Sequence, residues 1–229
     1  MSDSRNPAHD PASSGIDRRG FIGALGAGAT GSALFSRSVS GAKQSSELVT
    51  FVHDTHFHGR FGDPEDPENI ANYFGLMQQV ADANENALLV GNGDDLASSV
   101  LSSVFEGRHM IDAFDAGGLA FDTFGNHDFD MGPDVLRKMI QRGSTTWVSA
   151  NVTDERTGKV FGRSQGARSF RLVEAGDISV GLTGLITPEA PEITSMGQRT
   201  SVQDPAAALD ETVPQMRDAG ADADRKSVV

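Results

Sequence analysis

Short apolar runs alternate with amphipathic segments from Leu48 onward, and this alternation predicts the fold. Four runs have the length and the apolar residues of strands: Leu48–Val52, Ala87–Val90, Leu119–Phe124 and Thr145–Ser149. The segments between them repeat apolar residues at helical spacing, with predicted helices that begin at Asp66-Pro67, span Ser99–Phe114 and begin at Pro133. Strands and helices that alternate through short loops predict an α/β layered fold with a parallel sheet.

The later part of the chain predicts a hairpin and one more helix. Two strand-like runs, Ser169–Val173 and Ile178–Leu182, flank a turn at Glu174–Asp177. Asp204-Pro205 supplies a cap and a first-turn proline for a last helix. The segment Asp154–Ala167 is rich in Gly, Arg and Ser, which predicts a surface loop.

Residues 1–46 have the composition of an export signal followed by a disordered linker. A polar start leads into the pair Arg18-Arg19, and a weakly apolar, Gly/Ala-rich stretch follows at Gly23–Phe35. This order resembles a twin-arginine export signal, although a tail with a chance arginine pair would have the same residues. We therefore predict a signal and linker at 1–46, one folded unit at 47–229, and export to the periplasm, the cell surface or the medium.

The charge balance excludes some partners. The chain has 229 residues, with 32 acidic against 19 basic side chains and a formal net charge of −13. A basic surface for a nucleic acid polymer is therefore not expected. The acidic excess serves solubility or adaptation to high salt, and the scarcity of Lys favours a halophilic protein. The chain has no cysteine for disulfides or thiolate ligands, and no apolar run reaches the roughly 18 residues of a membrane span.

Residues that can bind metals follow three of the predicted strands. The segments are His53–Gly59, Gly91–Asp95 and Gly125–Asp130. The first two alone could be ordinary turns, whereas Asn126-His127 in the third is more distinctive, because a loop after a strand does not need that pair. Their conjunction is informative, because ligands of open α/β sheets gather beyond the carboxyl ends of the strands.

The order of these segments, D-x-H, then G-D, then G-N-H-D, resembles the calcineurin-like metallophosphoesterases. The approach to Asp54, the block Ser149–Val152 and the stretch Leu182–Pro191 are similar to the branch of 5′-nucleotidases and 2′,3′-cyclic-nucleotide phosphodiesterases. The resemblance extends from about Leu48 to about Ala221. It implies a layered α-β-β-α sandwich, of which this chain carries the N-terminal portion.

The resemblance also implies a centre of two divalent metal ions. Asp54 and His56 would bind the first ion, Asp94 would bridge both, and Asn126 would bind the second. Two ions roughly 3.5–4 Å apart can clamp a phosphoryl group during hydrolysis. Oxygen and imidazole ligands admit Mn, Zn, Fe, Co or Mg.

Three further residues receive roles from the same resemblance. His127 would meet the developing charge or protonate the leaving oxygen, and Asp130 would orient its imidazole. Asn151 would contact the phosphate of the substrate. The substrate would be a small phosphate ester, most simply a nucleotide.

The other polar and aromatic residues near these blocks are predicted to have structural roles. His58 is expected to be a loop residue or an outer neighbour of the metals, and Asp95 to cap the following helix. Asp128 and His109 are expected to face solvent. Packing roles are expected for Phe57, Phe129 and Trp147.

The family pattern continues with an apolar strand and two histidine blocks that this sequence does not contain. The chain reads Ala223–Val229 where that strand would begin, and no histidine follows His127. We therefore expect a truncated product, incomplete at its C-terminus, with a weak second metal site and little turnover. The alternatives are a non-catalytic metal- or phosphate-binding fragment and a pseudogene product.

Overall fold

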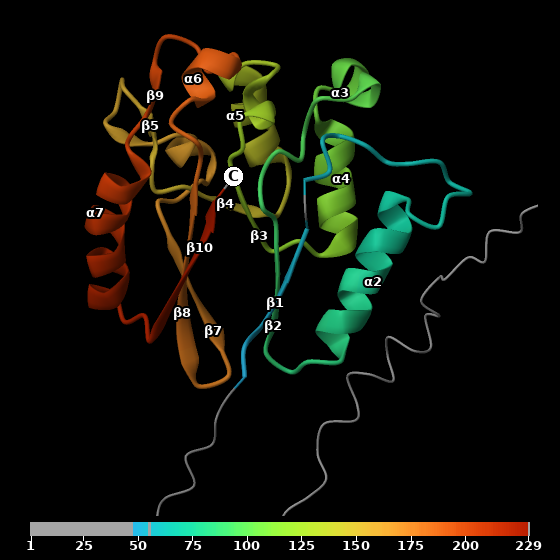
Figure 1. The fold of residues 1–229 in the computed structure, drawn as a ribbon, viewed down its shortest axis with the longest axis horizontal. Helices are drawn as coiled ribbons and strands as arrows, with labels where there is room; N and C mark the ends of the chain where they lie inside the picture. Colours follow the sequence, from blue (N-terminus) through green and yellow to red (C-terminus); the bar gives the residue numbers. More distant parts are fainter. Residues whose placement is uncertain (1–47, 55, 229) are drawn as a thin grey trace, which may run out of the picture. The chain divides into compact units, whose positions relative to one another are not determined.

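The central layer is a parallel sheet with strand order β1-β2-β3-β4 (Figure 1). Its strands are β1 (Thr50–His53), β2 (Ala87–Val90), β3 (Phe121–Thr123) and β4 (Thr146–Val148). The computed structural model describes residues 48–54 and 56–228, so the predicted signal at 1–46 lies outside the described residues. The alternation of strand and helix thus predicts these four strands correctly.

A second sheet packs against the first. It has the order β10-β8-β7, with β7 (Arg171–Ala175), β8 (Ile178–Leu185) and β10 (Ala223–Val228). The antiparallel pair β7 and β8 confirms the predicted hairpin. The run Ala223–Val228, which lacks the expected apolar character, nevertheless pairs in parallel with β8. Backbone groups form the hydrogen bonds of a sheet, so a polar sequence does not prevent this pairing.

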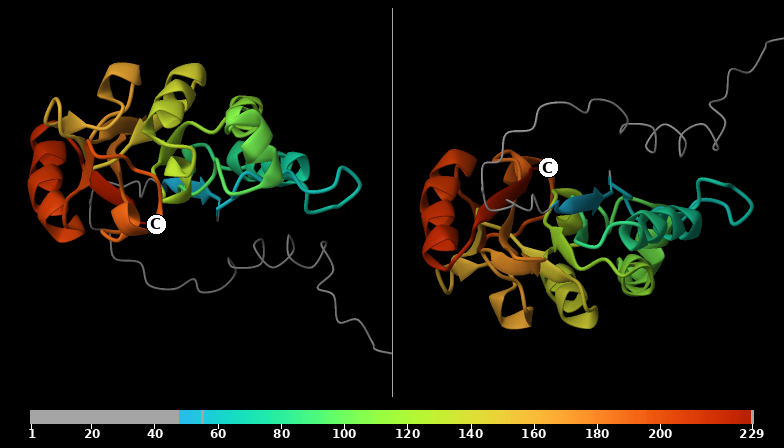
Figure 2. Two further views of the ribbon diagram at one scale, coloured as in Figure 1. Left: turned by 90° about the horizontal axis from the view of Figure 1, so that it is seen from above. Right: turned by 90° about the horizontal axis from the view of Figure 1, so that it is seen from below.

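Helices cover the outer faces of the two sheets. They are α2 (Ile70–Asp82), α3 (Val100–Phe105), α4 (Arg108–Gly117), α5 (Pro133–Arg142), α6 (Ala190–Ile193) and α7 (Pro205–Asp218). Seen from above, α7 lies at the opposite end from α2, with the strands between them (Figure 2). The predicted α-β-β-α layering is therefore confirmed. None of the helices among the described residues has the length and apolarity needed to cross a bilayer.

Two helix boundaries differ from the sequence prediction. The segment Ser99–Phe114 forms two helices, because Glu106 and Gly107 have left-handed φ values of 53° and 82° and break the hydrogen-bond ladder. The helix expected from Asp66-Pro67 begins only at Ile70. Its cap is Asn69, whose side chain accepts a hydrogen bond from the backbone N–H of Asn72.

A small third sheet occupies the region predicted to be a surface loop. It has the order β6-β5-β9, with β5 (Val152–Asp154), β6 (Lys159–Val160) and β9 (Thr200–Val202). Phe161, which directly follows β6, is fully buried and contacts the rings of Phe124 and Phe129. Most of Asp154–Ala167 is turns with exposed side chains, as predicted, but the prediction missed the short strand β6 and the buried Phe161.

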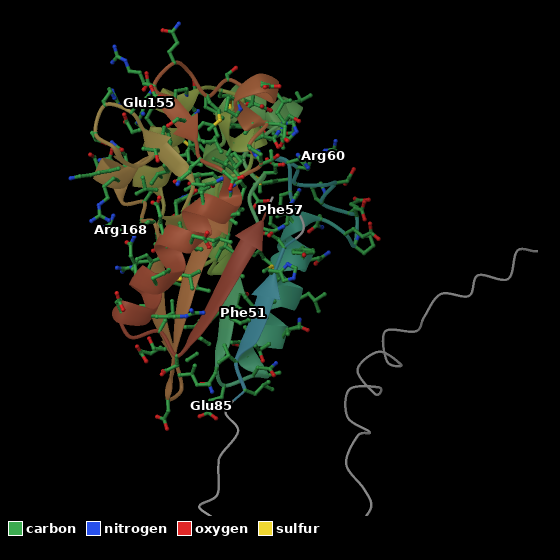
Figure 3. The ribbon with its side chains drawn as sticks, turned by 60° about the vertical axis from the view of Figure 1, so that its left-hand side comes forward. Phe51, Phe57, Arg60, Glu85, Glu155 and Arg168 are labelled. Atoms are coloured by element: carbon green, nitrogen blue, oxygen red, sulfur yellow. The ribbon has the colours of Figure 1, made fainter. Side chains whose placement is uncertain are left out.

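The parallel sheet separates two apolar clusters. The larger cluster lies under α2, α4 and α5 and includes Trp147, which is buried as predicted. The smaller cluster lies between the sheets, where Phe51 of β1 packs toward β7 and β8 (Figure 3). The sheets approach closely at Gly184, where an added Cβ would lie 2.8 Å from the carbonyl oxygen of Val148. This contact explains a glycine inside the long strand β8.

Candidate metal centre

The polar blocks meet at the carboxyl edge of the parallel sheet. The loops that follow β1 and β2 are joined by backbone hydrogen bonds, including His58 N–H to the Asp94 carbonyl at 3.0 Å. The loop after β3 is joined to the loop after β2 through the carboxylates of Asp94 and Asp128. Gly125 allows the third loop to approach, since an added Cβ there would lie 2.2 Å from Asp94 Oδ1. Steric crowding therefore explains why the first residue of the G-N-H-D block is a glycine.

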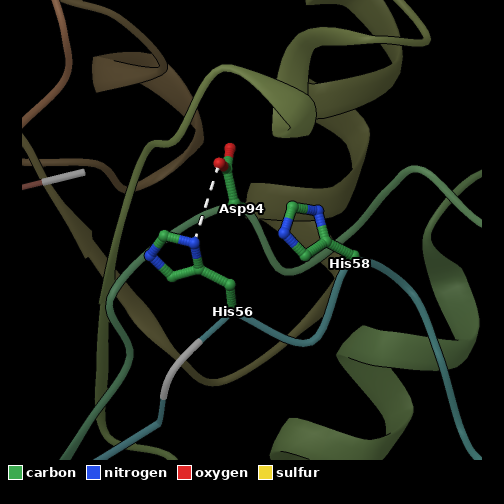
Figure 4. Close-up of side chains that lie close together, drawn as sticks. All are labelled: His56, His58 and Asp94. Atoms are coloured by element: carbon green, nitrogen blue, oxygen red, sulfur yellow. Dashed lines mark ion pairs between the residues drawn. The ribbon is translucent and has the colours of Figure 1, made fainter.

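His56, His58 and Asp94 form a group that can hold a metal ion (Figure 4). One ligand atom from each lies within 4.8 Å of the others, and His56 Nδ1 is 3.9 Å from Asp94 Oδ2. All three residues have positive φ values, and Glu106 is the fourth such non-glycine residue in the described part of the chain. Backbone of this kind costs energy and gathers at functional sites. The sequence prediction placed His56 and Asp94 at the metals but not His58.

Asp54 lies beside this group with one oxygen uncommitted. Its Oδ1 accepts a hydrogen bond from the N–H of Asn92 at 3.0 Å, whereas its buried Oδ2 has no hydrogen-bond partner. Burial raises the pKa of Asp54 to about 6. A cation at Oδ2 would favour the ionised form, so the donor set fits a divalent metal. Asn126 lies in the loop after β3, immediately before His127.

His127 and Asp130 form a hydrogen-bonded pair, as their spacing predicts. His127 Nδ1 lies 2.7 Å from Asp130 Oδ2, and Thr194 Oγ1 donates to Asp130 Oδ1 at 2.8 Å. The backbone N–H of His127 donates to Asp94 Oδ1 at 2.7 Å. Burial is the largest single influence and opposes protonation of His127. The hydrogen bond to Asp130 and the negative charges of Asp130, Asp94 and Asp128 together outweigh it and raise the pKa of His127 above its ordinary value. The catalytic role of the pair stays a prediction.

Asp128 does not face solvent as predicted but ties two of the loops together. Its Oδ1 accepts hydrogen bonds from the N–H groups of Asp95 and Leu96, and its Oδ2 accepts from those of Asp94 and Gly125. The residue is 2% exposed, and burial raises the pKa of Asp128 to about 7. No local pattern signals this role, because all four donors are backbone groups.

Two other structural roles were predicted wrongly. Asp95 does not cap the following helix; its Oδ1 accepts from the N–H of Phe57, while Ser99 caps α3. Burial raises the pKa of Asp95 well above its ordinary value. His109 is buried rather than exposed, and its Nε2 bonds to the carbonyl of Gly59 at 2.9 Å.

Asn151 lies away from solvent, with its amide committed to backbone groups. Its Nδ2 donates to the carbonyls of Ile186 and Gln203, and its Oδ1 accepts from the N–H of Ile186. The side chain is fully buried. These bonds join β5 to the segments around β8 and β9, so we leave Asn151 out of the proposed site.

Comparison with known proteins gives the same family as the motifs. No family model matches the chain. The human 5′-nucleotidase is 23% identical over 184 residues, covering 74% of this chain and 31% of the human protein. The fold is similar to a 5′-nucleotidase precursor of Thermus thermophilus (TM-score 0.67, 22% identity, covering 78% and 36%). It is also similar to a calcineurin-like phosphoesterase of Bacillus subtilis (TM-score 0.64, 23% identity, covering 78% and 60%).

The chain is thus similar in sequence to 5′-nucleotidases and similar in fold to a 5′-nucleotidase precursor and a calcineurin-like phosphoesterase. These likenesses agree with the resemblance drawn from the three blocks. The chain spans about a third of the length of the human relative. Its activity is therefore a proposal.

The buried carboxyl groups of this candidate metal centre predict an unusual pH dependence. With divalent ions removed by EDTA, the free energy of unfolding is expected to fall as the pH rises from about 4 to about 7. The folded state holds the pKa of Asp54 at about 6 and that of Asp128 at about 7, above the ordinary value of 3.8. Their contribution is complete below pH 4 and is lost as the pH rises through the folded pKa values.

Urea denaturation followed by circular dichroism at pH 5 and pH 8 would measure this effect. Added Mn²⁺ should reverse most of the loss at pH 8, because a cation favours the ionised form of Asp54. Hydrogen bonds from Arg156 lower the pKa of Asp154 to about 2. The stability that Asp154 contributes is therefore lost only below pH 4, so it does not affect the comparison of pH 5 with pH 8. A higher stability at pH 8 than at pH 5 in EDTA would contradict the prediction.

Proposed function

We propose that the chain forms the metal-binding part of a divalent-metal-dependent phosphoesterase that acts on nucleotides. One observation carries the proposal. The hydrogen-bonded pair of His127 and Asp130 is joined through the His127 backbone to Asp94, which also belongs to the metal-capable group. Hydrolysis of a phosphoester needs metal ions that bind the phosphoryl group and an acid that protonates the leaving oxygen, and this arrangement can supply both.

The metals would be held by Asp54, His56, Asp94 and Asn126. When bound, divalent cations supply positive charge to the phosphoryl oxygens and to the attacking water. His127 supplies the proton. Because Asp130 accepts from Nδ1, Nε2 is the atom that can donate to the leaving oxygen.

The substrate class rests on the relatives and on charge. The human relative is a 5′-nucleotidase, and a relative from Salmonella typhimurium is a 2′,3′-cyclic-nucleotide 2′-phosphodiesterase/3′-nucleotidase, 25% identical over 161 residues. A net charge of −13 disfavours a nucleic acid polymer and leaves small phosphate esters, whose charge the metals would neutralise.

A hydrolysis assay tests the proposal. The protein is given Mn²⁺ and then p-nitrophenyl phosphate, bis-p-nitrophenyl phosphate or AMP, and is compared with Asp94→Asn. Equal rates in both forms would sink the mechanism. Calorimetry separates the alternative of a non-catalytic binder, since one weak ion per chain favours the binder and two tight ions favour the enzyme.

Export is part of the proposal, and it rests on Arg18-Arg19 and the mild apolar stretch that follows them. The twin-arginine pathway carries folded cargo, which suits a protein whose metals are bound before export. Replacing both arginines with lysine should keep the protein in the cytoplasm, as judged by fractionation of cells that express it. Unchanged secretion would show that another signal is used.

A further inference from the structure

The family pattern assigns no metal-binding or catalytic role to the imidazole of His58. Three histidines in the described part of the chain bond to groups outside the metal-capable set: His53 to the Asp54 carbonyl, His109 to the Gly59 carbonyl and His127 to Asp130. His56 Nε2 lies 3.1 Å from the side-chain nitrogen of Asn92, which leaves its Nδ1 facing Asp94. His56 and His58 are the two that lie within ligand distance of each other and of Asp94. Their rings are 5.7 Å apart and meet edge to face.

The backbone holds His58 firmly in an unfavourable conformation. Its φ of 51° is left-handed, which costs a side chain other than glycine on the order of 1 kcal/mol. Hydrogen bonds on both sides of the residue maintain it: His58 N–H donates to the Asp94 carbonyl, and Gly59 N–H donates to the Asp95 carbonyl at 2.8 Å. The segment after β1 is thereby joined to the segment that carries Asp94.

The next carbonyl is fixed as well. The Gly59 carbonyl accepts from Ser99 Oγ at 2.5 Å and from His109 Nε2. Gly59 has no room for a side chain, because an added Cβ would lie 2.8 Å from the Leu96 carbonyl oxygen. A loop residue without a function would not need this many constraints.

The ring of His58 has polar neighbours besides the metal-capable group. The Ala97 carbonyl is a hydrogen-bond partner of the ring, and a ring nitrogen lies within 4.8 Å of the ligand atoms of His56 and Asp94. Histidine ligands in proteins commonly donate their second nitrogen to a carbonyl. The ring also meets that of His127 edge to face, at 5.0 Å between centroids.

We propose that His58 is a direct metal ligand, so that His56, His58 and Asp94 together with Asp54 hold one divalent transition-metal ion. The inference rests on the proposed function only in placing the metals at this site. Two imidazoles with carboxylates favour Zn²⁺, Mn²⁺ or Co²⁺ over Mg²⁺ and Ca²⁺, which prefer oxygen ligands.

Co²⁺ is a suitable probe because it is paramagnetic and reports the atoms bound to it. In the Co²⁺-loaded wild-type protein, proton NMR should show two exchangeable imidazole N–H signals shifted far downfield, from His56 and His58. His58→Asn should show one. Asparagine tolerates left-handed backbone, so this variant keeps the loop conformation. Its Co²⁺ affinity should fall at least about 100-fold, the upper end of the effect of changing an outer neighbour of a metal.

His53→Asn is the matched control, since it removes an imidazole outside the group, and it should keep both signals and wild-type affinity. A single shifted signal in the wild type, or wild-type affinity in His58→Asn, would overturn the assignment while leaving the proposed function standing. The number of shifted signals in the wild-type spectrum tests the assignment even if a variant fails to fold. If the wild type binds neither Co²⁺ nor Mn²⁺, the proposed function itself fails and the assignment fails with it.

Discussion

Replacing Asp94 with asparagine is expected to weaken divalent-metal binding by about 100-fold or more and to lower phosphoesterase turnover by about 10³-fold. Asp94 is the carboxylate at the centre of the group, with Oδ1 bonded to the His127 N–H and Oδ2 near His56 Nδ1. The amide has the same shape but no charge, so the loops keep their positions while the site loses the anion shared by the metals. The loss should therefore appear in metal affinity rather than in folding.

Isothermal titration with Mn²⁺ measures the affinity, and release of p-nitrophenol measures the turnover. Asp112→Asn is a suitable control, because Asp112 is an exposed carboxylate paired with Arg142. It should leave both quantities unchanged. If Asp94→Asn binds Mn²⁺ as tightly as Asp112→Asn does, Asp94 is not a ligand.

Replacing Asp128 with alanine is expected to lower the free energy of unfolding by about 4 kcal/mol, a large part of the stability of a typical domain. Four backbone N–H groups would lose their acceptor, and each unsatisfied buried donor costs about 1 kcal/mol or more. The loops after β2 and β3 would separate, so metal binding should weaken in parallel.

Urea denaturation at pH 7 measures this change, with Asp115→Ala as the control. Asp115 also accepts two hydrogen bonds, from the N–H and the hydroxyl of Ser144, but it is exposed and water can replace it. We expect a loss of about 1 kcal/mol or less in the control. Similar losses in the two variants would show that Asp128 does not secure the loops.

The sequence predicted elements where the local pattern is strong. Short apolar runs such as Ala87–Val90 and the proline Pro133 at a helix start are local signals, and the structure follows them. The predicted ends of helices were wrong where the side-chain pattern continued but the backbone turned. The helical periodicity of Ser99–Phe114 continues across Glu106 and Gly107, although those two residues turn the chain.

The sequence likewise predicted only those residues of the candidate site that have a local signal. Asp54, Asp94 and the pair His127 and Asp130 follow strands in a recognisable order, so their meeting at one sheet edge could be inferred. The spacing of His56 and His58 offered a signal for a second imidazole that the family pattern did not use. Asp128 offered none, since its partners are backbone N–H groups and three of the four lie more than thirty positions away.

The sequence by itself determined the parallel sheet and the edge where the metal-capable residues gather, because these depend on residue type and periodicity. Tertiary structure alone decided which polar residues face the metals and which support the loops. Asp94 and Asp128 are both aspartates in turns after strands, yet one presents its carboxylate to the group and the other is bonded to four backbone donors. The difference arises because burial and hydrogen-bond partners come from segments distant in the chain.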